Sequence, residues 1–100
     1  MGIAVEQREK LNLVCLDGAV DIASAAELKT SLIQALEPGH ALSIALDRCT
    51  HLDVTAVQLL WAAERKAKAL GVEFTLAGAV PEPVSATLRE AGFENLTIHV

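Results

Sequence analysis

Short alternating runs of apolar and polar residues open the chain and predict two strands. Apolar residues recur at every second position over Ile3–Arg8 and Leu11–Asp17. Only Glu9 and Lys10 separate the two runs, so we expect a hairpin. Gly18 is predicted to end the second strand, because glycine weakens strand structure.

The next segment carries the signals of a helix. Ser24 is followed three residues later by Glu27, the spacing of a capping box at a helix N-terminus. Pro38 and Gly39 are expected to stop the helix. The positions expected to be buried recur three or four residues apart: Ala25, Leu28, Leu32, Ala35 and Leu36.

A second strand and helix follow. Ala41–Leu46 is a predicted strand, and its small residues on one face indicate neighbouring strands on both sides. A short polar loop then leads to Asp53, which has the side chain to cap a helix over Thr55–Leu70 that stops at Gly71. The stripe expected to be buried consists of Ala56, Leu59, Leu60, Ala63, Ala67 and Leu70.

The last third of the chain predicts a strand, a helix and a strand. Val72–Ala77 and Leu96–Val100 alternate as strands do, and a helix is expected to begin near Pro81 and Pro83 and to end at Gly92. Polar residues mark one face of the sheet as facing water: Ser43, Glu73, Thr75, Thr97 and His99.

These elements predict an α/β fold with a mixed sheet of about five strands and the helices packed on one face. Helices collected on one face require the strand order to advance in one direction, since strand-helix-strand connections are right-handed. One hundred residues suffice for one core, so residues 1–100 are expected to form a single domain.

Composition narrows the partners. The formal net charge of −5 and the lack of a basic stripe argue against nucleic acid or an anionic membrane surface. No apolar run approaches the ~20 residues of a membrane helix, and no signal peptide is recognisable, so no membrane insertion and a cytoplasmic location are expected. Cys15 and Cys49 are therefore expected to be reduced thiols.

Thr55 is the candidate regulatory residue. It falls in the first turn of the long helix, where the backbone carries a partial positive charge. A phosphate on its hydroxyl would be stabilised by that charge, yet crowded by Asp53 and by Asp47. The alternative is that Thr55 is an ordinary residue of a helix N-terminus, where threonine is common.

Trp61 is the candidate anchor for a protein partner. On a helical wheel it lies beside Gln58 and Arg65, away from the buried stripe, and Val57 lies on the same side. Tryptophan is enriched among binding hot spots, so Val57, Gln58 and Trp61 are predicted to contact a partner. The alternative is that another segment of the chain covers Trp61.

Cys49, His51 and Asp53 alternate along the polar loop and suggest either metal ligands or a thiol–imidazole enzyme. Their spacing matches no recognised zinc pattern, and a loop cysteine with a solvated histidine is the simpler interpretation. The sequence also has no glycine-rich phosphate loop. No metal, cofactor or enzymatic activity is therefore predicted.

Two segments together resemble the STAS domain, the family of the anti-sigma-factor antagonists. One runs from Leu16 to Asp21 and leads into Ala25–Leu28; the other comprises Leu46-Asp47 and Leu52–Leu60. The resemblance implies that Thr55 is the phosphoacceptor. It also implies a switch loop made of Asp21, Asp53, Val54 and Ala56, in which Val54 replaces a serine of the family pattern and Ala56 replaces a glycine.

The resemblance further implies a non-enzymatic regulatory module that binds a protein. The implied partner is an anti-sigma factor with serine kinase activity or another signalling protein, and phosphorylation of Thr55 would break the complex. The alternative is an unphosphorylated structural or adaptor subunit of a larger assembly, such as a stressosome-like particle or a lipid-transport complex. The sequence leaves the oligomeric state open.

Overall fold

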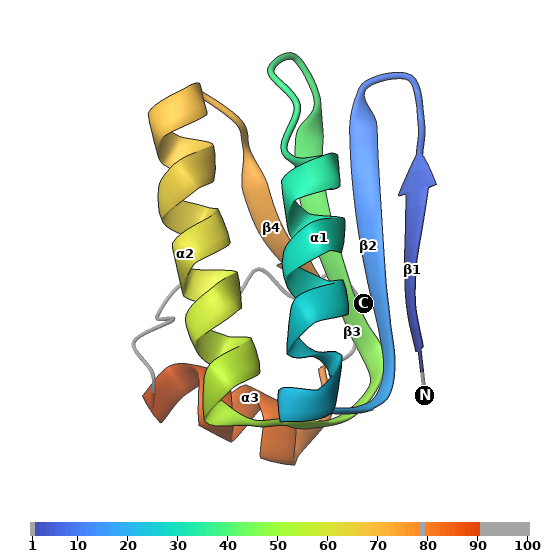
Figure 1. The fold of residues 1–100 in the computed structure, drawn as a ribbon, viewed down its shortest axis with the longest axis vertical. Helices are drawn as coiled ribbons and strands as arrows, with labels where there is room; N and C mark the ends of the chain where they lie inside the picture. Colours follow the sequence, from blue (N-terminus) through green and yellow to red (C-terminus); the bar gives the residue numbers. More distant parts are fainter. Residues whose placement is uncertain (1, 79, 91–100) are drawn as a thin grey trace.

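Four strands and three α-helices alternate along the chain (Figure 1). The structure is a computed structural model and describes residues 2–78 and 80–90. The elements are β1 (Gly2–Gln7), β2 (Leu11–Val20), α1 (Ala25–Ala35), β3 (Ala41–Leu52), α2 (Val54–Leu70), β4 (Phe74–Ala77) and α3 (Glu82–Glu90), with a 3₁₀ turn (Ile22–Ser24) before α1.

The described strands form one mixed sheet in the order β1-β2-β3-β4. β1 pairs with β2 antiparallel, whereas β2–β3 and β3–β4 are parallel pairs. The strand order therefore advances in one direction, and the predicted hairpin and the mixed sheet are confirmed. β3 has a neighbour on each side, as its small residues indicated. The strand predicted over Leu96–Val100 lies outside the described residues.

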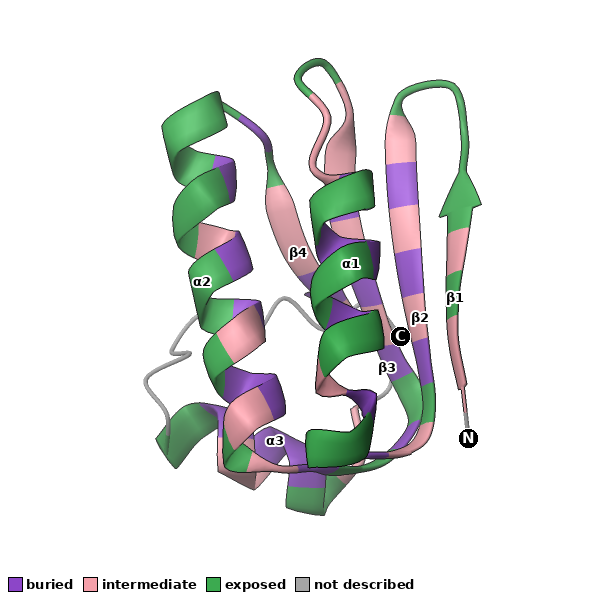
Figure 2. Cartoon of the chain, viewed as in Figure 1, coloured by how far each residue is buried: buried purple, intermediate pink, exposed green. Residues whose placement is uncertain are grey.

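The helices enclose the core from one face of the sheet. Figure 1 shows α1 and α2 side by side in front of the sheet, with α3 below the ends at which both begin. Purple bands of buried residues in Figure 2 run along the sheet and along the helix sides that meet it. Val14, Ile44 and Leu60 are completely buried there. Each such side chain contributes roughly 1.5–3 kcal/mol by leaving water.

Gly18 does not end β2, so this prediction was wrong. The strand continues to Val20, and its pairing with β3 shifts register between Gly18 and Ala19. Gly18 has a φ of +80°, which glycine adopts without a steric penalty. Glycine therefore absorbs an irregularity in the ladder here rather than terminating it.

The polar loop predicted after Leu46 is also wrong, because β3 runs on to Leu52. The extra residues pair with the end of β2, with Gly18 opposite Cys49 and Val20 opposite Leu52. Ladder hydrogen bonds to a neighbouring strand thus hold a polar sequence in extended form.

Helix ends follow the sequence in part. Gly71 ends α2 as predicted, with a φ of +70°. The capping box is wrong, because the Ser24 side chain makes no capping hydrogen bond and a 3₁₀ turn precedes α1 instead. Leu70, expected in the buried stripe, is 38 % exposed, since it lies in the last turn beyond the sheet. Val72 is buried although β4 begins only at Phe74.

Candidate functional site

Two acidic residues meet at one edge of the sheet because two parallel strands end there together. Val20 and Leu52, the last residues of β2 and β3, are register partners. Asp21 and Asp53 directly follow them, and the Asp53 N–H donates to the Val20 carbonyl at 3.1 Å. The structure therefore brings Asp21 and Asp53 to the same edge, which the sequence implied only through the family resemblance.

Asp53 caps α2, as predicted. Its Oδ1 accepts hydrogen bonds from the backbone N–H groups of Thr55, at 2.8 Å, and of Ala56, at 3.2 Å. Its backbone is extended, with φ −86° and ψ 169°, as is typical of an N-cap residue. Two of the N–H groups that a helix N-terminus leaves unpaired are thus satisfied by one carboxylate.

Thr55 is the second residue of α2 and is half-buried. Its backbone N–H is held by Asp53, while none of the hydrogen bonds found over residues 2–78 and 80–90 uses its hydroxyl. The hydroxyl thus lies in the first turn, near the positive end of the helix dipole, with the Asp53 carboxylate bound to the same residue's N–H. This arrangement suits a group that can gain a charge.

Asp47 is not part of this arrangement, contrary to the expectation that it would crowd a phosphate. Five residues of extended chain separate it from Leu52, a span of roughly 15 Å at the rise of a strand. Asp47 instead packs against Gly78: a Cβ built on that glycine would lie 3.1 Å from the Asp47 Cβ. The closeness of β4's end to β3, rather than the switch, explains this glycine.

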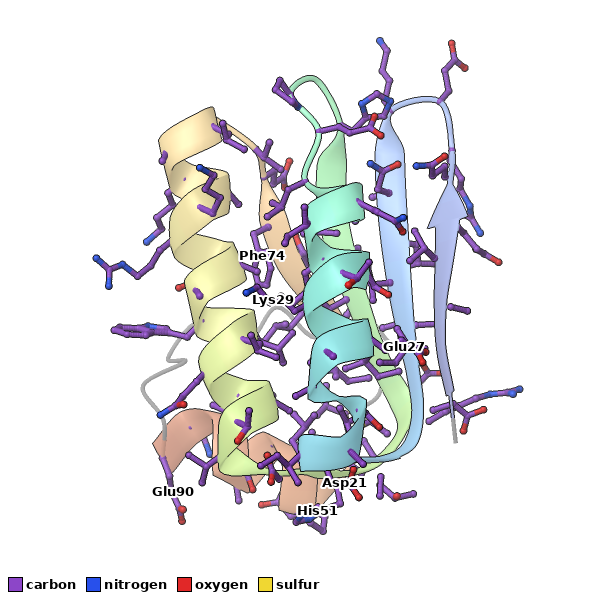
Figure 3. The ribbon with its side chains drawn as sticks, viewed as in Figure 1. Asp21, Glu27, Lys29, His51, Phe74 and Glu90 are labelled. Carbon is purple, nitrogen blue, oxygen red and sulfur yellow. The ribbon has the colours of Figure 1, made fainter. Side chains whose placement is uncertain are left out.

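Two exposed apolar side chains stand next to the two caps. Ile22 follows Asp21 and is 72 % exposed, and Val54 follows Asp53 and is 70 % exposed. Figure 3 shows Asp21 and His51 together at this lower edge of the molecule. The sequence analysis missed Ile22, although an aspartate followed by a β-branched apolar residue occurs after both strands and could have shown it.

The predicted partner-binding residues divide between surface and core. Trp61 is 46 % exposed, and the Arg65 guanidinium carbon lies 5.1 Å from the centre of a Trp61 ring. Gln58 is exposed, but Val57 is only 4 % exposed, so its placement on an open face with Trp61 was wrong. The reason is α3: Val57 lines a hollow of about 380 Å³ together with Thr87 and Glu90.

Cys49 and His51 do not form a catalytic pair. Cys49 is completely buried in β3 rather than placed in a loop, and its Sγ donates to the His51 backbone carbonyl at 3.5 Å. Burial raises the pKa of the Cys49 thiol, so the nucleophilic thiolate is disfavoured. The His51 side chain is exposed. Within the described ranges, no three His, Cys, Asp or Glu side chains gather in a way that could hold a metal ion.

No helix in the described part of the chain is both long enough and apolar enough to cross a bilayer.

Solved structures with the same fold are anti-sigma-factor antagonists. An antagonist from Mycobacterium paratuberculosis superposes with a TM-score of 0.82 at 18% identity, covering 98% of this chain and 84% of that one. Unphosphorylated SpoIIAA gives 0.77 at 15% identity, with 99% and 88% covered. RsbS of Moorella thermoacetica gives 0.79 at 20% identity, with 98% and 86% covered.

Sequence comparison gives a more specific assignment. No protein with a curated description matches the sequence. A family model described as "Mlab, STAS domain" matches residues 3–98, nearly the whole chain. Together with the mixed sheet and the helices on one face, this match shows that the chain belongs to the STAS domain family.

Proposed function

We propose that this STAS domain is a non-enzymatic regulatory module that binds a protein through the edge at which β2 and β3 end. The docking surface consists of Asp21, Ile22, Asp53, Val54 and Thr55, and is called the cap edge below. The observation that carries the proposal is the half-buried Thr55 in the first turn of α2, with its N–H bound to Asp53 and an exposed Val54 beside it.

The apolar part of the cap edge supplies contact area. Ile22 and Val54 are largely exposed, and a partner that covered both would remove apolar surface from water. Gln58 lies one turn beyond Val54, and Trp61 extends the same side of α2. Such a mixture of large apolar side chains and a polar rim is typical of protein-binding surfaces.

Phosphorylation of Thr55 would act as an electrostatic switch at this edge. A phosphate brings a charge of about −1.5 to −2 at neutral pH. The helix N-terminus attracts it, but the Asp53 carboxylate already accepts hydrogen bonds from the N–H groups of Thr55 and Ala56. The added charge would therefore project outward beside Asp21 and Asp53 and repel acidic groups of a partner such as an anti-sigma factor or a kinase.

The test compares Thr55→Glu with Thr55→Val in a pull-down from native cell extract, followed by an affinity measurement with the recovered partner. Thr55→Val should bind as the wild type does, and Thr55→Glu should bind at least tenfold more weakly. Thr30→Glu is the matched control, because Thr30 is exposed on α1 away from the cap edge. Equal binding of Thr55→Glu and the control would rule out the switch.

A second candidate function is a permanent subunit of a larger assembly, such as a stressosome-like particle or a lipid-transport complex. The exposed Ile22, Val54 and Trp61 favour it, since a surface of this kind is commonly covered in a stable complex. Val54 and Ala56, which depart from the pattern of phosphorylated members, also favour it. Protein purified from native cells would then have the unmodified mass and remain in a complex through gel filtration.

A further inference from the structure

A second surface lies between the two parallel helices, on the other side of α2 from Trp61. It is a groove of about 320 Å³, called the inter-helix groove below. Its apolar lining comes equally from α1 and α2: Leu32, Ile33, Leu36, Leu59, Ala62 and Ala63. Ile33 is 62 % exposed, which is unusual for a large aliphatic side chain, and Leu36 and Leu59 are half-buried.

The charges at this groove are all of one sign. Lys29 of α1 and Lys66 of α2 complete its lining, which contains no acidic residue. Figure 3 shows Lys29 in the space between the two helices. Neither lysine takes part in any ion pair found over the described ranges, where the pairs join Arg8 to Glu6, His40 to Glu37 and Arg89 to Glu82. In a chain of net charge −5, this local positive rim stands out.

The two lysines are spaced along the groove. Lys29 is the fifth residue of α1 and Lys66 the thirteenth of α2, and Figure 1 shows both helices beginning at the same end of the sheet. Eight residues of difference at 1.5 Å each separate the two positions by about 12 Å along the helix axes. One small anionic headgroup cannot pair with both lysines at that separation. Two carboxylates about two turns apart on one helix can.

We propose that the inter-helix groove binds an acidic amphipathic helix of a partner protein. Leucine-type side chains at i, i+3 or i+4, and i+7 would cover Ile33, Leu36 and Leu59, as in other helix-in-groove complexes. Two acidic residues about eight positions apart would face Lys29 and Lys66. The groove is distinct from the cap edge, so this binding event does not depend on the function proposed above.

The probe is a pair of capped, dye-labelled helical peptides of about four turns. Both carry the same apolar stripe. One has glutamates eight positions apart beside it, and the other has lysines there. Fluorescence anisotropy with the full chain should show at least tenfold tighter binding of the glutamate peptide. The double variant Lys29→Glu with Lys66→Glu should reverse that preference.

Two further variants locate the site. Ile33→Glu should weaken the glutamate peptide about tenfold, and the exposure of Ile33 in the wild type allows this variant to fold, which circular dichroism would check. Trp61→Ala should leave the affinity unchanged, because Trp61 is not among the groove residues. The reverse pattern, with binding lost on Trp61→Ala alone, would overturn the assignment to this groove.

Backbone amide shifts provide the final distinction. The glutamate peptide should shift the amides of Ile33, Leu59 and Ala62 and leave those of Val54 and Gln58 in place. Equal affinity for the two peptides, or no binding of either, would refute the proposal. Shifts of the groove amides by palmitate without any by the peptides would assign the groove to a lipid instead and would also refute it.

Discussion

The beginnings of α1 and α2 have the same topological place and different structures. Both helices follow parallel strands that end in register, and an aspartate comes first in each case. At α2, Asp53 caps the helix itself and binds two N–H groups. At α1, Asp21 binds one N–H group, that of Ala23, and a 3₁₀ turn intervenes before the helix.

The difference decides which helix end can act as a switch. In α1 the residue at the N-cap, Ser24, is only 8 % exposed, so the helix end faces the protein. In α2 the corresponding end has Val54 at 70 % exposure and Thr55 half-buried behind it. A charge can therefore be added to the first turn of α2 without being buried, whereas the start of α1 excludes it.

The largest expected effect comes from forcing a charge into the closed end. Ser24→Glu should lower the free energy of unfolding by roughly 2–3 kcal/mol, because a buried carboxylate loses its hydration. Urea denaturation followed by circular dichroism would measure it. Ser24→Ala is the control for loss of the serine alone and should cost less. A loss below 1 kcal/mol for Ser24→Glu would mean that this end is as open as that of α2.

Removal of the cap of α2 should have the next largest effect. Asp53→Ala leaves the N–H groups of Thr55 and Ala56 without their acceptor and should cost about 1–2 kcal/mol. Asp53→Asn keeps an acceptor oxygen and should retain most of the stability. The comparison of the two variants in urea denaturation separates the cap from the charge, and equal losses would show that the carboxylate acts through its charge.

Asp21→Ala should cost less, about 0.5–1 kcal/mol, because one hydrogen bond in a short 3₁₀ turn is lost and α1 itself keeps its start. The same denaturation experiment ranks it against Asp53→Ala. If Asp21→Ala proved the more damaging of the two, the proposed inequality between the helix beginnings would be wrong.

The smallest expected effect on stability is that of Thr55→Glu, within about 0.5 kcal/mol of the wild type. Attraction to the helix N-terminus and repulsion by Asp53 oppose each other there. Thr55→Lys, which lacks the attraction to the helix dipole, should be the less stable of the pair at low ionic strength. A large loss in Thr55→Glu would indicate that the site cannot hold an added charge in the folded protein.

Several local features could be predicted from the sequence because a few neighbouring residues encode them. The cap at Asp53 and the stop at Gly71 each depend on one side chain or one backbone conformation, and both are confirmed. The periods of two and of three to four residues likewise gave the element order over the described chain. Ser24 and Glu27 show the limit, since their spacing matched a capping box that the fold does not form.

Tertiary structure alone decided the extent of β3 and the exposure along α2. The polar residues 47–51 read as a loop until the end of β2 pairs with them, and that pairing joins residues about thirty positions apart. Val57 is covered because α3 comes to lie beside α2, which no helical wheel includes. The sequence by itself thus determined the fold class, the caps and Thr55 as a candidate. Burial and strand length arise from contacts between distant segments, so only the assembled molecule defined the cap edge and the inter-helix groove.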